Sequence, residues 1–305
     1  MTIALQSSKL EQKNVYSVPF LADQHQEFVL WFFTGSRCNL ECTHCYVESS
    51  PTANQHPYLT FETFWKYLDE ALKRKDKQLE IYFTGGEPFI NPEITKMLKK
   101  SLEFANTTVL TNAIRITKKL AKKLQVIQAN SKNILTFRVS LDGPSEETND
   151  LIRGANSFKN ANKGLKNLVE AGFNPIITAM KSWSNNNNND VNSQYVELVE
   201  DIGIPQGQSR LKLLPPILIG NEEKRNRSYN ETEMFTEGCF IDYNYNNLQC
   251  SKCRMVSENG VWVCPILIND DEARMGDTIK EASKPYEMKQ MACWTCRMSG
   301  LNCEN

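Results

Sequence analysis

The chain has 305 residues, 40% of them hydrophobic, which is enough for one large core or for one core with a smaller appended unit. Its formal net charge of −1 gives no indication of binding to nucleic acid or to an anionic membrane. The first 20 residues lack a signal pattern, and no stretch approaches the roughly 18 apolar residues of a membrane span. We therefore expect a cytoplasmic protein with neither membrane nor nucleic-acid partners.

Apolar and β-branched runs alternate with amphipathic stretches along most of the chain. The predicted strands are Glu27–Phe33, Leu79–Thr84, Thr107–Leu110, Leu135–Leu141, Pro175–Ala179 and Arg210–Leu214. The predicted helices between them are Phe61–Lys75, Pro92–Phe104, Thr117–Gln125, Phe158–Ala171 and Val191–Ile202, and Thr60 is placed to cap the first of these. Right-handed crossovers between such strands predict an α/β fold, a partial (β/α)6 TIM-like barrel with a mostly parallel sheet.

The alternation of strands and helices stops at Pro215 and Pro216, directly after the last predicted strand. We expect an N-terminal extension over residues 1–26, the partial barrel over 27–214, and a small cysteine-rich unit over 215–305. Metal would hold the small unit together in place of a large apolar core.

Cysteine usage predicts two metal sites. Three of the ten cysteines lie between Cys38 and Cys45, and the other seven lie between Cys239 and Cys303. In a reducing compartment, cysteines are more often metal ligands or catalytic thiols than disulfides.

The first cysteine motif is Cys38-x3-Cys42-x2-Cys45, in the loop that follows the first predicted strand. Three thiolates so close in sequence can hold three irons of a cubane cluster and leave the fourth iron without a protein ligand. A zinc site is the alternative, with His44 as its fourth ligand.

Polar motifs also follow the next three predicted strands, at Thr84–Pro88, Thr111–Asn112 and Ser140–Gly143. In barrel enzymes the carboxyl ends of the strands form the rim on which active sites are built. The coincidence of four polar motifs at this rim favours an active site over a zinc knuckle.

Together these motifs resemble the radical S-adenosylmethionine (SAM) superfamily, over roughly Glu27 to Leu214. The resemblance implies that Cys38, Cys42 and Cys45 ligate a [4Fe–4S] cluster whose open iron binds SAM. It implies reductive cleavage of SAM to methionine and a 5′-deoxyadenosyl radical, which abstracts hydrogen from a substrate carbon. It also implies an electron donor of the flavodoxin or ferredoxin type.

The resemblance extends to the residues that contact SAM. Gly85, Gly86 and Glu87 resemble the motif that receives the SAM amino group, and the two glycines let the backbone approach a ligand closely. Asn112, at the next strand end, belongs to the same set of expected cofactor-binding residues.

Three further residues match SAM-binding positions of the family. Ser140 and Arg153 resemble positions that contact the ribose and the carboxylate, and an arginine fork suits a carboxylate because it donates two parallel hydrogen bonds. His44 matches the usually aromatic position near the adenine. The alternatives are a turn-forming hydroxyl for Ser140 and a surface ion pair for Arg153.

The cysteine-rich tail contains two elements of a metal site. Cys250 and Cys264 flank a predicted hairpin near Gly260, and Cys293-x2-Cys296 forms a hook. This arrangement resembles the twitch unit, a shortened SPASM domain that binds one auxiliary [4Fe–4S] cluster. The resemblance implies Cys250, Cys264, Cys293 and Cys296 as its ligands.

Several alternatives remain open for the tail. Cys253 or Cys303 could replace one of the four ligands, and zinc could replace the cluster. The cysteines left over among Cys239, Cys253 and Cys303 are either buried apolar residues or include a hydrogen-atom donor.

The sequence leaves the substrate open between two classes. We expect a small polar metabolite, because peptide-modifying members of the family often carry an additional N-terminal domain and only 26 residues precede the first predicted strand. The alternative is a maturase that cross-links or epimerises a peptide or protein side chain. A non-catalytic iron–sulfur or zinc protein is disfavoured, because it has no use for the strand-end motifs.

Overall fold

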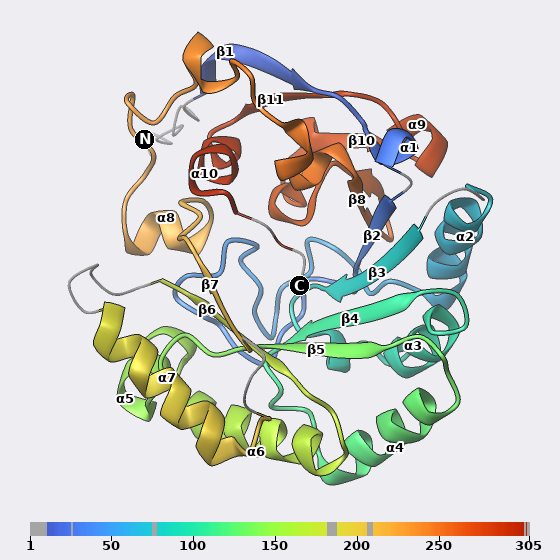
Figure 1. Ribbon diagram of the computed structural model, residues 1–305, viewed down its shortest axis with the longest axis vertical. Coiled ribbons are helices and arrows are strands. Elements are labelled where there is room, and N and C mark those ends of the chain that lie inside the picture. The colour runs from blue at the N-terminus through green and yellow to red at the C-terminus, as the bar shows by residue number, and fades with distance from the viewer. Residues whose placement is uncertain are drawn as a thin grey trace, which may run out of the picture.

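The computed structural model describes residues 11–25, 27–74, 78–181, 188–205, 210–301 and 303. Six parallel strands form its centre, and each pairs with the next in chain order. These strands are β2 (Glu27–Phe33), β3 (Gln78–Thr84), β4 (Asn106–Thr111), β5 (Leu135–Ser140), β6 (Ile176–Met180) and β7 (Leu211–Leu214). The predicted partial barrel is therefore confirmed (Figure 1).

Strand β2 lies inside the sheet, with β3 on one side and a strand of the tail on the other. Each residue from Phe28 to Phe33 is at most 1% exposed. Burial on both faces explains why this strand is a continuous apolar run and does not alternate with polar residues.

Helices cover the outer face of the barrel strands (Figure 1). Thr60 caps helix α2 (Phe61–Leu72) as predicted, since its Oγ1 accepts a hydrogen bond from the Thr63 amide at 3.2 Å. The helices up to β7 are α1 (Ala22–His25), α2 (Phe61–Leu72), α3 (Ile94–Ser101), α4 (Lys118–Ala129), α5 (Glu146–Arg153), α6 (Ser157–Glu170) and α7 (Asn188–Ile202). In the described ranges, none of the helices is long and apolar enough to cross a bilayer.

The segment after β5 differs from the prediction, because it contains α5 before the expected helix α6. Ser145 begins α5 with a reciprocal capping box to Thr148, and Gly154 ends it with a φ of +94°. The helix carries Arg153 in its last turn, next to the ends of the barrel strands.

The tail continues the barrel sheet, so its strands are not set apart from the barrel. Strand β8 (Cys253–Ser257) pairs in parallel with β2, so that Cys253 lies opposite Val29. Strands β9 (Gly260–Trp262) and β10 (Arg274–Gly276) follow in antiparallel order and complete a nine-stranded sheet. The pairing covers the edge of β2 that would otherwise expose unpaired backbone groups. A functional division at Leu214 therefore remains a proposal.

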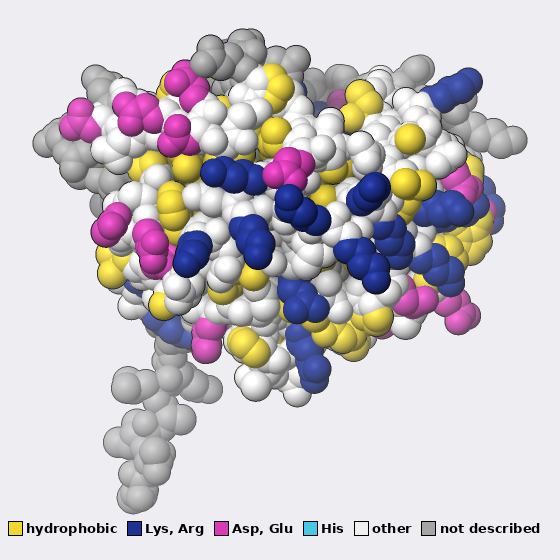
Figure 2. All heavy atoms as spheres, turned by 90° about the horizontal axis from the view of Figure 1, so that it is seen from below, with side chains coloured by type: hydrophobic (Ala, Val, Ile, Leu, Met, Phe, Trp, Pro, Cys, Tyr) yellow, Lys and Arg dark blue, Asp and Glu magenta, His cyan; other side chains and the backbone are white. Residues whose placement is uncertain are grey.

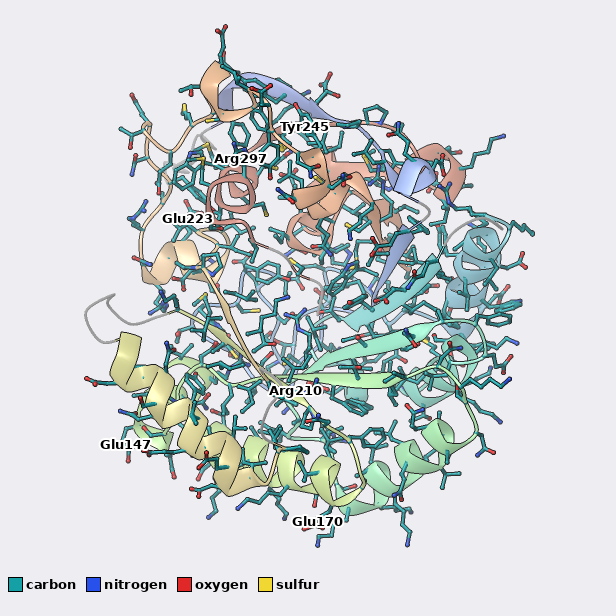
Figure 3. The ribbon with its side chains drawn as sticks, viewed as in Figure 1. Glu147, Glu170, Arg210, Glu223, Tyr245 and Arg297 are labelled. Atoms are coloured by element: carbon teal, nitrogen blue, oxygen red, sulfur yellow. The ribbon has the colours of Figure 1, made fainter. Side chains whose placement is uncertain are left out.

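The N-terminal extension packs on the same tail. Strand β1 (Glu11–Val18) pairs antiparallel with β11 (Tyr286–Gln290) in a second, two-stranded sheet. Helices α8 (Asn221–Arg225), α9 (Ile279–Ala282) and α10 (Ala292–Ser299) complete the tail. Arg297, labelled in Figure 3, lies on α10, and its Cζ is 3.8 Å from the centroid of the Tyr243 ring. Residues from both ends of the chain thus close one side of the molecule.

Candidate active site and second cysteine cavity

The three cysteines of the first motif line one cavity, at the carboxyl ends of the barrel strands. Backbone amides donate to two of the sulfurs, from Leu40 to Cys38 at 3.4 Å and from Ser49 to Cys45 at 3.3 Å. Burial raises the pKa of the Cys38 thiol to about 12 and that of Cys42 to about 11. Both thiols are therefore neutral in the metal-free protein, and metal binding must release their protons.

Three thiols in one cavity are a donor set that suits a multi-iron cluster. Among the described residues, no three His, Cys, Asp or Glu side chains converge closely enough to hold a single metal ion. A zinc ion needs its sulfur ligands about 2.3 Å from one point. In a cubane each thiolate binds a different iron, so the sulfurs lie further apart.

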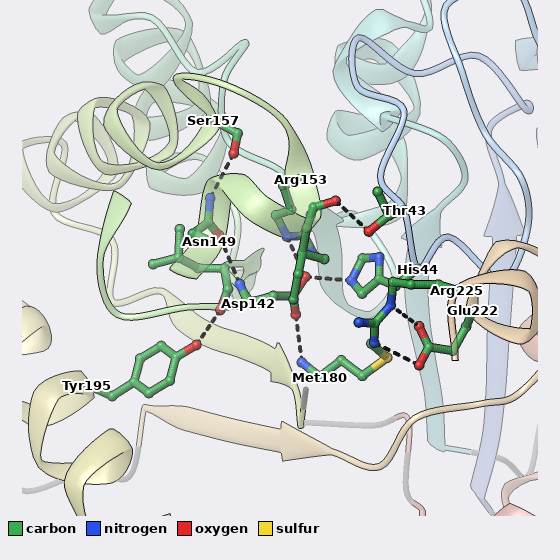
Figure 4. A network of polar contacts seen from close by, with 12 residues as sticks. Thr43, His44, Asp142, Asn149, Arg153, Ser157, Met180, Tyr195, Glu222 and Arg225 are labelled. Atoms are coloured by element: carbon green, nitrogen blue, oxygen red, sulfur yellow. Dashed lines mark hydrogen bonds and ion pairs between the residues drawn. The ribbon is translucent and has the colours of Figure 1, made fainter. Parts of the chain in front are cut away.

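The buried carboxylate of Asp142 holds the side chains of His44 and Arg153, two of the residues predicted to bind SAM (Figure 4). Its Oδ2 lies 2.6 Å from His44 Nε2 and 2.6 Å from Arg153 Nε, and its Oδ1 accepts from the Met180 amide at 2.7 Å. Burial alone would raise the pKa of Asp142, but the charges of Arg153 and His44 outweigh it and lower that pKa below its usual range. The ionised carboxylate therefore orients both side chains at the cavity wall.

Glu87 is occupied by the protein itself. Its carboxylate, 1% exposed, accepts hydrogen bonds from the Phe89 amide at 3.0 Å, Thr111 Oγ1 at 2.7 Å and the Asn112 amide at 2.8 Å. Burial raises its pKa, which these hydrogen bonds oppose. The side chain ties the end of β3 to the end of β4, so its contact with the SAM amino group stays a prediction.

The glycine pair lies at the cavity wall, directly beneath the cysteine loop. A Cβ on Gly86 would lie 2.1 Å from the Arg37 carbonyl oxygen, and one on Gly85 would lie 2.6 Å from Thr34 Oγ1. The Gly86 amide donates to the Gly35 carbonyl at 2.9 Å. The close packing of the cysteine loop therefore requires glycine at both positions. This requirement is additional to the predicted close approach of the backbone to a ligand.

Asn112 and Ser140 line the same cavity from the ends of β4 and β5. Asn112 Nδ2 lies 3.7 Å from Cys38 Sγ and donates to Asn39 Oδ1 at 3.0 Å. Six of the seven predicted cofactor-binding residues therefore share one cavity with the three cysteines, and Glu87 supports them from behind.

Two charged residues of this cavity were missed from the sequence. Asp142 was noted only as part of a strand-end motif. Arg138 is 1% exposed and donates from Nε to Thr178 Oγ1 at 3.2 Å and from Nη1 to the Cys303 carbonyl. The available signal was its position in an apolar strand two residues before Ser140, because residues two apart on a strand point to the same face.

A second, smaller cavity in the tail brings together the four predicted auxiliary ligands, Cys250, Cys264, Cys293 and Cys296. Burial raises the pKa of Cys250 to about 11, that of Cys264 to about 12, and those of the other two well above the usual value. The rest of its wall is mostly apolar and consists of Leu248, Gln249, Val263, Ile266, Leu267, Tyr286 and Met288.

The remaining tail cysteines lie elsewhere. Cys253 is fully buried in β8 and its thiol donates to the Val263 carbonyl at 3.6 Å. Cys303 lines the first cavity. Cys239 Sγ accepts a hydrogen bond from the Thr236 amide at 3.5 Å and lies 3.5 Å from the Thr236 hydroxyl. The arrangement supports the four-cysteine set over the alternatives that include Cys253 or Cys303.

The fold and the first cavity are those of a barrel enzyme with three cysteines in its active-site cavity. The sequence-family model of the radical SAM superfamily matches residues 32–190, more than half of the chain. The chain therefore belongs to the radical SAM superfamily, a class of enzymes that bind a [4Fe–4S] cluster and SAM.

Similar proteins include the mycofactocin maturase MftC of Mycobacterium ulcerans, 29% identical over 52% of this chain and 42% of the relative. The subtilosin biosynthesis protein AlbA of Bacillus subtilis is 34% identical over 45% of this chain and 29% of its own. A probable GTP 3′,8-cyclase of Saccharolobus islandicus is 25% identical over 60% and 56%. The matches thus span well under two thirds of these relatives.

Two solved structures have the same fold. Streptococcus suis SuiB bound to SAM has a TM-score of 0.62 at 18% identity, covering 82% of this chain and 63% of its own. Native anSMEcpe with bound SAM has a TM-score of 0.60 at 17% identity, covering 83% of this chain and 79% of its own. At these identities the likeness supports the fold alone.

Proposed function

We propose that this protein cleaves SAM reductively in the first cavity and uses the resulting radical to abstract hydrogen from a substrate carbon. The observation that carries the proposal is the convergence of Cys38, Cys42 and Cys45 with Asn112 and Arg153 on one cavity at the carboxyl rim of the barrel. When bound, the cluster and SAM supply an open iron, an electron and a 5′-deoxyadenosyl radical.

The protein's own side chains would bind and orient SAM and the cluster. Arg153, held by the Asp142 carboxylate, presents cationic N–H groups to the SAM carboxylate. Asn112 donates toward Cys38 Sγ, and such hydrogen bonds tune the potential of a cluster. Apolar wall residues, among them Trp31 and Leu110, exclude water from the reacting atoms.

The second cavity is proposed to hold an auxiliary [4Fe–4S] cluster on Cys250, Cys264, Cys293 and Cys296. Four thiolates occupy every iron, so this site has no position for SAM. Its role in an oxidation would be to accept the electron that the substrate radical loses.

The substrate is proposed to be a peptide or protein side chain. Support comes from the names of the relatives, a maturase and a bacteriocin biosynthesis protein, and from the fold of SuiB, which also binds its precursor peptide SuiA. A small polar metabolite is the second candidate, favoured by the probable GTP cyclase, which matches the larger share of this chain. A flavodoxin or ferredoxin is the proposed electron donor.

The test is anaerobic reconstitution with iron and sulfide, followed by iron counting and a dithionite assay for 5′-deoxyadenosine. We expect about eight irons per chain, four for each cluster, and deoxyadenosine formed from SAM. The matched control replaces Cys38, Cys42 and Cys45 by alanine. It should retain about four irons and form no deoxyadenosine. Failure of the fully loaded parent to cleave SAM, with peptides or metabolites present, would contradict the proposal.

A further inference from the structure

Three neighbouring helices on the outside of the barrel carry many lysines and almost no acids. The sequences of α3, α4 and α6 contain a single acidic residue, Glu170. Figure 2 shows this underside, where dark blue side chains gather over α4 and α6. We call the exposed lysines of these helices the basic face: Lys96, Lys99, Lys118, Lys119, Lys122, Lys123, Lys159, Lys163 and Lys166.

Side-chain contacts join the three helices into one surface. Lys123 Nζ, on α4, donates to Thr95 Oγ1 of α3 at 3.0 Å. Lys118 Nζ, at the start of α4, lies 3.0 Å from the carboxylate of Glu170 at the end of α6, which is labelled at the lower edge of Figure 3. The exposed lysines of the three helices therefore form one continuous surface.

Most of this charge is not neutralised locally. Within the described part of the chain, Lys119, Lys122 and Lys163 have no carboxylate within 4.0 Å. The acids lie on other helices, with three on α5 and four on α7, which contains no lysine or arginine. A net charge of −1 thus conceals two oppositely charged regions, and such a separation steers and orients a charged partner.

The basic face is connected to the first cluster site. Asn112 Nδ2 lies 3.7 Å from Cys38 Sγ, and α4 begins six residues later at Lys118. Six residues span at most about 20 Å. A Cβ on Gly164 would lie 2.1 Å from the Ala113 carbonyl oxygen, so α6 packs directly on the same turn. Two of the three basic helices, α4 and α6, are thus anchored at the turn that contacts Cys38.

We propose that the basic face docks an acidic electron-transfer protein, which reduces the cluster held by Cys38, Cys42 and Cys45. Each encounter passes one electron, so the donor is oxidised by one electron and the cluster is reduced by one. The inference rests on the proposed function, because SAM cleavage consumes an electron that the protein must obtain repeatedly. A small, salt-sensitive contact suits such a transient partner.

Binding of an oxidised acidic flavodoxin to the reconstituted protein tests the surface without turnover. The variant Lys119→Glu, Lys122→Glu, Lys163→Glu should weaken binding at least about tenfold at low ionic strength. Glutamate near the start of α4 is compatible with the helix dipole, so the fold should persist. The matched control, Lys280→Glu, Lys284→Glu, Lys289→Glu, makes the same charge change on α9, β11 and the segment between them and should bind within about twofold of the parent.

The same proteins are then compared in SAM cleavage. With reduced flavodoxin as the donor, the basic-face variant should be at least about tenfold slower than the parent, whereas with dithionite the rates should be equal. Equal flavodoxin affinity in all three proteins, or a parent that ignores flavodoxin and binds a short DNA duplex, would overturn the docking proposal. A parent that binds flavodoxin through these lysines but forms no deoxyadenosine with dithionite would instead refute the proposed function.

Discussion

Both cysteine cavities contain thiols whose pKa is raised, but the two cavities differ in their walls. Burial raises the pKa of Cys38 and of Cys264 alike to about 12. The first cavity adds Asp142, Arg153 and Asn112, whereas the wall of the second is almost entirely apolar. The two sites therefore share thiols with a raised pKa. Among the residues that the structure describes, only the first has charged side chains in its wall, which suit it to bind a small molecule in addition to a cluster.

The two cavities also differ in the number of predicted cysteine ligands, which is three in the first and four in the second. Three cysteines leave one iron of a cubane open, and they lie beside the side chains that can hold a charged ligand. Four cysteines leave no iron open, and among the residues that the structure describes no charged side chain lines their cavity. We infer that the first cavity binds and cleaves SAM, whereas the second stores or relays an electron.

The largest effect should follow from Gly86→Ala, which breaks the first cavity and spares the second. The added Cβ would lie 2.1 Å from the Arg37 carbonyl oxygen, so the cysteine loop must shift. A misplacement of about 1 Å can cost about 100-fold in rate, and we expect at least that loss in deoxyadenosine formation. The iron held by the tail should remain.

The control for this substitution is Gly238→Ala. A Cβ there would meet only Thr236 Oγ1, at 3.9 Å, and Gly238 lies outside both cavities. Its SAM cleavage should equal that of the parent. Unchanged activity in Gly86→Ala would show that the loop does not depend on the glycine.

A smaller effect, on stability, should follow from Asp142→Asn. Removal of one partner from a buried charge cluster typically costs about 3 to 5 kcal/mol, because Arg153 stays buried without its counter-charge. Unfolding by denaturant near pH 7, in the metal-free protein, measures the loss. Asp201→Asn, on the exposed side of α7, is the control and should change stability by less than about 0.5 kcal/mol.

The stability difference between the parent and Asp142→Asn should depend on pH, because the pKa of Asp142 is lowered in the folded protein. A carboxyl group with a lowered folded-state pKa stabilises fully above its unfolded pKa of about 3.9 and loses this contribution as the pH falls towards the folded value. The stability gap between parent and Asp142→Asn should therefore be constant above about pH 5 and shrink below about pH 4. A gap that widened in acid would contradict the ionised carboxylate.

Local features of the fold were readable from the sequence. Glu27–Phe33 was predicted with the bounds of β2, since a buried strand is a continuous apolar run between polar residues. Thr60 was recognised as a cap because the capping hydrogen bond spans only three residues. The spacing of the first cysteine motif and the strand-end motifs indicated the site for the same reason: each is encoded in a short segment.

Features that depend on distant partners were not readable. The pairing of β8 with β2 joins Cys253 to Val29, more than 200 residues away, and no local pattern specifies it. Arg138 inside β5 and the central position of Asp142 depend equally on which side chains the fold brings near them. The four-cysteine set was suggested by resemblance, and only the cavity separates it from Cys253 and Cys303.

The most direct test of the account is electron paramagnetic resonance of two reduced, reconstituted variants, each with and without SAM. One lacks Cys38, Cys42 and Cys45, and the other lacks the four cysteines of the second cavity, so each should retain about four irons. The account predicts that SAM changes the spectrum only of the variant that keeps the first three cysteines. A SAM-dependent change in the variant that keeps only the tail cysteines would contradict it.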